Sequence, residues 1–193
     1  MFLAAMWLDI VWPVLLLAGL ESVRVEPGIT RVTPFDFVSY PYSHSLLFAG
    51  FWGIGFGAAV WLATRDKTYA VVAGLLVPSH WLLDWIVHRE DLPLYPGSGK
   101  FGLGLWHSLS ATLAAEFLVF GCGLLIYWRK TRARDRIGSY GLAGLAVFLV
   151  VMYGLSLVAT PPSDPQALAV GSLSVLLLVL WAWWVDRHRV VVE

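Results

Sequence analysis

The segment PSHWLLDWIVHRE, residues 78–90, ends an apolar run that begins near Tyr69. An apolar run of about twenty residues predicts a membrane-spanning helix. This run carries His80, Asp84 and His88 at intervals of four, and such positions share one face of a helix. Ionisable side chains inside a membrane are costly and usually serve a function. The segment therefore predicts both a spanning helix and a functional site.

Composition places the whole chain in the membrane class. Of its 193 residues, 59% are hydrophobic and only 13% are charged, and the mean hydropathy is +0.73. These values are typical of a polytopic membrane protein. The formal net charge is zero, so no nucleic-acid partner is expected. We expect an integral protein of a bacterial-type inner or plasma membrane, without a cleavable signal peptide because the N-terminus lacks a basic region.

The apolar runs predict an all-α protein of about six transmembrane helices. Basic clusters lie at Arg65 and Lys67, within residues 129–136, and at Arg187 and Arg189. If the spans alternate, these clusters share one side, which the positive-inside rule assigns to the cytoplasm. Both termini are then cytoplasmic, and the long loops face outward. The predicted spans lie near residues 2–20, 44–63, 68–88, 105–128, 138–160 and 167–186.

Polar and ionisable side chains that could form a site are unevenly distributed along the chain. They are concentrated between Asp9 and Glu116, whereas the last two spans carry almost none. We therefore predict a four-span core over residues 1–128 that holds the site. Residues 129–193 would add two accessory transmembrane helices and a cytoplasmic tail.

Other ionisable groups are predicted to lie at the same depth in the membrane as His80 and Asp84. His44 lies at the outer start of the second span, and Asp9 lies inside the first. A lone carboxylate in lipid usually has a partner. Imidazole together with carboxylate suits zinc, manganese or iron better than calcium. We therefore predict a divalent metal, zinc favoured, with Asp9, His44, His80 and Asp84 as ligands.

Other residues are predicted to complete an outward-facing site. His107 and His88 are candidate catalytic residues, as general acid or as ligands of a second ion. Arg24, Arg89 and Lys100 are weaker candidates for anion clamps in the outer loops. Structural alternatives stay open: His80 and Asp84 could form a hydrogen-bonded packing pair, His44 could be an interfacial helix start, and His88 could be solvated.

Three motifs resemble the YdjM-like membrane proteins, which are described as predicted metal-dependent hydrolases. They are PYSHSLL (41–47), PSHWLLDWIVH (78–88) and LPLYPGSGKFGLGLWHS (92–108), and the likeness covers about residues 7–110. It implies site roles for His44 with Ser45, for Ser79 with His80 and Asp84, and for the Pro-rich outer loop 92–96. Family members carry an early His and an Asp pair in the first span, where this chain has only Asp9.

These observations favour a metal-dependent hydrolase whose site faces the outer side. The His-x-x-x-Asp element is also similar to one in zinc-dependent phospholipases C, which implies a phosphoester, lipid-linked or small-molecule substrate. A bound metal can lower the pKa of a water and polarise a phosphoryl oxygen. Two alternatives remain open: a metal-ion or proton transporter or channel, and a non-catalytic membrane subunit whose polar cluster fixes helix packing.

Overall fold

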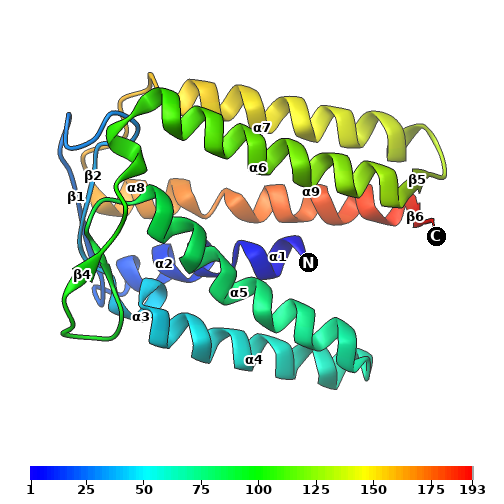
Figure 1. The fold of residues 1–193 in the computed structure, drawn as a ribbon, viewed down its shortest axis with the longest axis horizontal. Coiled ribbons are helices and arrows are strands. Elements are labelled where there is room, and N and C mark those ends of the chain that lie inside the picture. The colour runs from blue at the N-terminus through cyan, green and yellow to red at the C-terminus, as the bar shows by residue number, and fades with distance from the viewer. Residues whose placement is uncertain (193) are drawn as a thin grey trace. The chain divides into compact units, whose positions relative to one another are not determined.

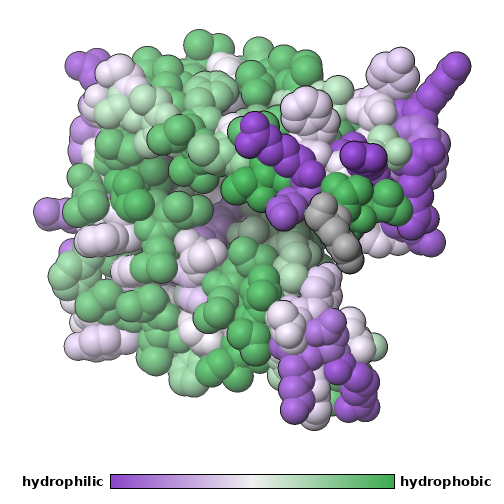
Figure 2. Space-filling model, turned by 45° about the vertical axis from the view of Figure 1, so that its right-hand side comes forward, coloured by the Kyte–Doolittle hydropathy of each residue, from purple (hydrophilic) through white to green (hydrophobic). Residues whose placement is uncertain are grey.

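The computed structural model describes residues 1–192 and is mostly helical, which confirms the predicted class (Figure 1). Five helices are long and apolar enough to cross a membrane. Hydrophobic side chains make up much of the face seen in Figure 2. Exposed Ile54, Leu118 and Leu177 are examples of side chains that a lipid environment would cover. The five candidate spans are Leu46–Thr64, Lys67–Val87, Leu109–Lys130, Ile137–Ser156 and Pro165–Arg187.

The first predicted span differs most from expectation. Instead of one helix over residues 2–20, α1 (Phe2–Ala5) and α2 (Trp7–Leu17) are separated by a turn at Met6. The eleven residues of α2 are about 16 Å long, well short of a bilayer core of about 30 Å. Leu8, Trp12 and Leu16 form a buried stripe on one face. A sixth long span is therefore not confirmed among residues 1–192.

Helices α4 (Leu46–Thr64) and α5 (Lys67–Val87) form a closely packed pair. A Cβ added at Gly53 would lie 2.6 Å from the carbonyl oxygen of Gly74, and one at Gly57 would lie 3.1 Å from that of Ala70. Small residues at these positions let two helix backbones approach, as they commonly do in membrane proteins. This packing holds α5, and hence His80 and Asp84, against α4.

The two long loops that were predicted to face outward contain short antiparallel strand pairs. Strand β1 (Ser22–Val25) pairs with β2 (Phe35–Ser39), with Arg24 opposite Asp36. The short helix α3 (Pro41–His44) follows and begins on a proline, a residue that suits the first turn of a helix. These elements carry the chain from the end of α2 to His44.

The second of these loops, after α5, folds back over the end of that helix. Its strands β3 (Leu92–Pro93) and β4 (Lys100–Phe101) pair, and the backbone N–H of Gly104 donates to the His88 carbonyl at 2.7 Å. Gly104 has φ +73°, a conformation that glycine adopts without strain. The 3₁₀ turn Leu105–His107 follows.

Contacts group the chain into two compact units. Residues 1–108 and 161–175 form the first, which includes α8 (Pro165–Ser172) packed against α2. Among the described residues, 109–160 and 176–192 form the second. By this grouping the third of the five long helices, Leu109–Lys130, which corresponds to the fourth predicted span, belongs with the C-terminal helices. The functional core over residues 1–128 remains a prediction.

The second unit is built from α6 (Leu109–Lys130), α7 (Leu142–Ser156) and α9 (Val175–Arg187). A π-helical turn over Ile137–Gly141 leads into α7. Strand β5 (Thr131–Ala133) pairs with β6 (Arg189–Val191), which ties the chain after α9 to the basic segment after α6.

Candidate metal centre

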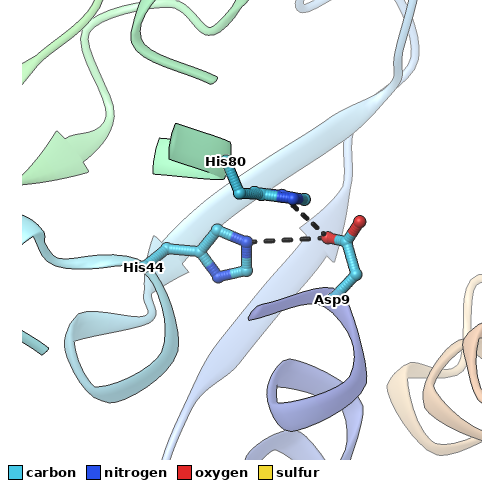
Figure 3. A group of neighbouring side chains, drawn as sticks. All are labelled: Asp9, His44 and His80. Atoms are coloured by element: carbon cyan, nitrogen blue, oxygen red, sulfur yellow. Dashed lines mark ion pairs between the residues drawn. The ribbon is translucent and has the colours of Figure 1, made fainter. Parts of the chain in front are cut away.

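The structure brings together the four residues predicted as metal ligands. The imidazoles of His44 and His80 point toward one carboxylate oxygen of Asp9, Oδ1, from Nε2 distances of 3.6 and 3.5 Å (Figure 3). Oδ2 of Asp84 lies 3.7 Å from Nε2 of His44 and 3.3 Å from Nε2 of His80. Two imidazole nitrogens and two carboxylates therefore face a common centre, and Asp9, His44 and His80 form a group that could hold a metal ion.

One carboxylate atom in this group lacks an ordinary partner. Oδ2 of Asp84 is buried and accepts no hydrogen bond from the described residues. A buried carboxylate oxygen without a hydrogen bond is costly. A cation at the common centre would satisfy it, so the residues present fit a divalent ion.

The tautomer of His80 follows from its hydrogen bond to the backbone. Nδ1 of His80 lies 2.7 Å from the carbonyl oxygen of Ala5. A carbonyl only accepts, so in neutral His80 Nδ1 carries the proton and Nε2 presents its lone pair to the carboxylates. Ala5 is the last residue of α1, directly before the turn at Met6.

His44 is held from the other side by a serine and a glutamate. Its Nδ1 lies 2.8 Å from Oγ of Ser43, and that hydroxyl donates to Oε2 of Glu21 at 2.6 Å. Burial raises the pKa of the Glu21 carboxyl, and the hydrogen bonds from Ser43 oppose that shift. Trp81 donates its indole N–H to the carbonyl of His44 at 2.8 Å, which ties α3 to α5.

His88 belongs to a neighbouring cluster rather than to the four-ligand group. Its Nδ1 lies 2.9 Å from Oδ1 of Asp91, and the Tyr40 hydroxyl donates to the same oxygen at 2.9 Å. The His88 ring packs on Trp106 with centroids 4.1 Å apart. Burial and the adjacent Asp91 raise the pKa of Tyr40 well above its usual value. Tyr40 also packs on His44, with centroids 5.3 Å apart, and so links the two clusters.

His107, the other predicted catalytic residue, is exposed on the 3₁₀ turn. The His107 ring lies beside Gly104: a Cβ added at Gly104 would lie 3.1 Å from Cδ2 of His107. The structure does not place it in the group formed by Asp9, His44 and His80. Its predicted catalytic role therefore gains no geometric support.

The predicted anion clamps have different surroundings. The guanidinium of Arg89 pairs with Asp36 and, through Nε at 3.2 Å, with Asp91. Lys100 donates to the carbonyl oxygens of Phe37 and Val38 at 3.1 and 2.9 Å. Arg24 is exposed on β1. Arg89 and Lys100 thus join the two long loops that follow α2 and α5, and binding of an anion by any of the three stays a prediction.

Four residues of these clusters were not singled out from the sequence: Glu21, Tyr40, Ser43 and Asp91. Two of them had a local signal, since Ser43 precedes His44 directly and Asp91 follows His88 by three residues. Glu21 had none, because it lies 22 residues before its partner Ser43. Contacts at that separation depend on how the intervening loop folds.

The arrangement has the chemistry of a site for a divalent transition metal. Two neutral imidazoles and two carboxylates can supply two negative charges to a dication, and nitrogen and oxygen ligands of this kind suit zinc, manganese or iron. Each histidine has a hydrogen-bond partner on its remote nitrogen, as metal-binding histidines usually do. No family model, curated protein or solved structure matches this chain.

Proposed function

We propose that this chain is an integral membrane, metal-dependent hydrolase that acts on a phosphoester, on either a lipid-linked or a small-molecule substrate. Asp9, His44, His80 and Asp84 would hold the ion, with zinc favoured. The observation that carries the proposal is the convergence of these four side chains, with Nε2 of both histidines directed at two carboxylates. The resemblance to YdjM-like predicted hydrolases supports the same reaction class.

The residues of the site would have different roles. A bound dication supplies Lewis acidity toward a phosphoryl oxygen and toward water. The side chain of Asp9 is 41% exposed, whereas those of His44, His80 and Asp84 are 7%, 14% and 15% exposed, so substrate would approach from the Asp9 side. His88, oriented by Asp91, is the better placed of the two predicted proton donors because Tyr40 connects it to His44.

We also propose the predicted topology of six spans with both termini in the cytoplasm of a bacterial-type inner or plasma membrane. Residues 2–20 would cross with the five long helices despite the turn at Met6. Arg65 and Lys67, the basic segment 129–136 and the C-terminal arginines would then share the inner side. The metal centre would lie toward the outer side, since His80 and Asp84 occupy the second half of α5.

The arrangement of α5 favours hydrolysis over transport. Between Lys67 and His80 the helix carries no ionisable side chain other than Tyr69, and Ala70, Ala73 and Val77 are buried there. A conduction path for ions or protons would need polar groups across the membrane. The polar groups of α5 instead end at one cluster.

Two measurements on the detergent-purified protein test the proposal. We expect stoichiometric bound zinc, manganese or iron by elemental mass spectrometry, and loss of that metal in His80→Ala and Asp84→Ala but not in His107→Ala. We also expect release of a phosphorylated head group from phospholipid micelles, or of inorganic phosphate from lipid-phosphate micelles, and a chelator should stop either reaction. Near-zero metal in the unaltered protein after metal supplementation would refute the site, and bound metal without any phosphoester hydrolysis would refute the reaction class.

A further inference from the structure

Glu21 is a buried carboxylate in an unusual setting. Its residue is only 4% exposed, and among residues 1–192 it forms no ion pair with a lysine or arginine within 4.0 Å. Among the described residues, Glu21 accepts hydrogen bonds from the backbone N–H groups of Tyr42 and Ser43 and from the Ser43 hydroxyl, all in α3. Such a group needs an explanation, because burying a carboxylate without a cationic partner is costly.

We propose that Glu21, acting through the hydroxyl of Ser43, sets the tautomer of His44 and is thereby a positioning residue of the metal centre. This role rests on the proposed metal site and extends it to residues that do not touch the ion. It makes Glu21 and Ser43 necessary for tight metal binding although neither is a ligand.

The direction of each hydrogen bond follows from the donors available. The backbone N–H groups of Tyr42 and Ser43 both donate to Oε1 of Glu21 at 2.8 Å. Oε2 accepts the Ser43 hydroxyl proton at 2.6 Å. With its own proton committed to Glu21, the Ser43 oxygen acts as acceptor for Nδ1–H of His44 at 2.8 Å. Nε2 of neutral His44 is then unprotonated, and it is the atom that faces Asp9 and Asp84.

This arrangement parallels the one at His80, where the acceptor is the Ala5 carbonyl. In both imidazoles Nδ1–H therefore points away from the common centre and Nε2 points toward it. The acceptors that fix them, Ser43 and Ala5, lie in different segments of the chain. Outer partners of this kind raise the basicity of a ligating histidine, and their removal typically lowers metal affinity about 10- to 100-fold. The carboxylate of Glu21 can do so only through Ser43.

Glu21→Gln is the sharpest variant because it keeps the size of the side chain. Its amide oxygen can still accept the two backbone N–H groups, whereas its NH₂ group must donate to Ser43. The Ser43 hydroxyl is then free to donate to Nδ1 of His44, which moves the imidazole proton to Nε2 and blocks the metal lone pair. We expect zinc and cobalt affinity of the full-length protein to fall about 10- to 100-fold. Glu26→Gln, an exposed position in the same loop, is the matched control and should bind like the unaltered protein.

A double-mutant cycle separates this relay from a general structural effect. Ser43→Ala should also weaken cobalt binding and change the visible absorption of the bound ion. Glu21→Gln should add nothing further in the Ser43→Ala background. Unchanged affinity in Glu21→Gln, or two effects that simply multiply, would overturn the relay while leaving the metal site intact. Absence of zinc and cobalt binding in the unaltered protein would overturn both proposals.

Discussion

His80 donates its Nδ1 proton to the carbonyl oxygen of Ala5, 75 residues earlier in the chain, at 2.7 Å. The bond joins the second half of α5 to the end of α1, immediately before the turn at Met6. One contact thereby orients the imidazole and attaches the broken first segment to the site. The interruption of the first predicted span is thus part of how the candidate metal centre is built.

Metal should stabilise the protein, and Asp84 should be required for that effect. An ion present at 100 times its dissociation constant adds about 2.7 kcal/mol to the free energy of unfolding if it binds only the folded state. We expect added zinc to raise the thermal midpoint of the unaltered protein and of His107→Ala, but not that of Asp84→Asn. Equal zinc-induced shifts in all three proteins would contradict the role of Asp84.

Arg89 should matter more for folding than Arg24. Arg89→Leu leaves Asp91, whose side chain is 2% exposed, without a guanidinium partner that is itself 28% exposed, and leaving a buried polar group short of a partner costs about 1–3 kcal/mol. Arg24 is exposed on β1, so Arg24→Leu should change stability by less than about 0.5 kcal/mol. Chemical denaturation in detergent compares the two, and similar costs would show that the Asp36–Arg89–Asp91 cluster has no special role.

Alanine at two nearby glycines of α4 should act in opposite directions. At Gly53 the added methyl would meet the Gly74 carbonyl at 2.6 Å and Pro78 Cδ at 3.0 Å, and overpacking typically costs about 1–3 kcal/mol. At Gly55 it would meet nothing within 4 Å, so the higher helix propensity of alanine should stabilise the helix by up to about 1 kcal/mol. Thermal midpoints of Gly53→Ala and Gly55→Ala test this contrast.

Asp135 should contribute a pH-dependent increment of stability. The backbone N–H of Gly138, followed by His188, lowers the pKa of its carboxyl. A group whose folded pKa is depressed stabilises the protein above its unfolded pKa of about 4 and loses that contribution as pH falls through the folded pKa. We expect Asp135→Asn to have a lower thermal midpoint than the unaltered protein at pH 6, with the gap closing toward pH 3. Glu90→Gln serves as the exposed control, and a gap that stays constant with pH would contradict the assignment.

The proposed orientation predicts which loops a membrane-impermeant reagent can reach. In a Cys122→Ser background, Glu90→Cys in the outer loop should react with an impermeant maleimide in intact cells. Arg134→Cys, in the basic segment after α6, should react only after the membrane is permeabilised. Both positions are exposed. The reverse pattern would show that the chain is inserted the other way.

Much of the architecture could be predicted from local patterns. Apolar runs identified the five long helices because a lipid-spanning helix must be continuously apolar over about twenty residues. The four-residue spacing of His80 and Asp84 placed them on one face of α5, as their Nε2–Oδ2 distance of 3.3 Å confirms. The same reasoning predicted one helix over residues 2–20, where the structure has two helices separated at Met6. Apolar composition alone does not distinguish a long span from a short buried helix such as α2.

The side-chain contacts between distant segments were decided only by the tertiary structure. Whether His44 meets Asp9, whether Glu21 reaches Ser43, and whether Arg89 turns toward Asp36 or toward a ligand all depend on how β1, β2 and α3 fold over the helix ends. Helix periodicity specifies which side chains share a face, because it acts over a few residues. Contacts across 20 to 75 residues are selected by the burial and hydrogen bonding of the whole loop, which leave no local periodic signal.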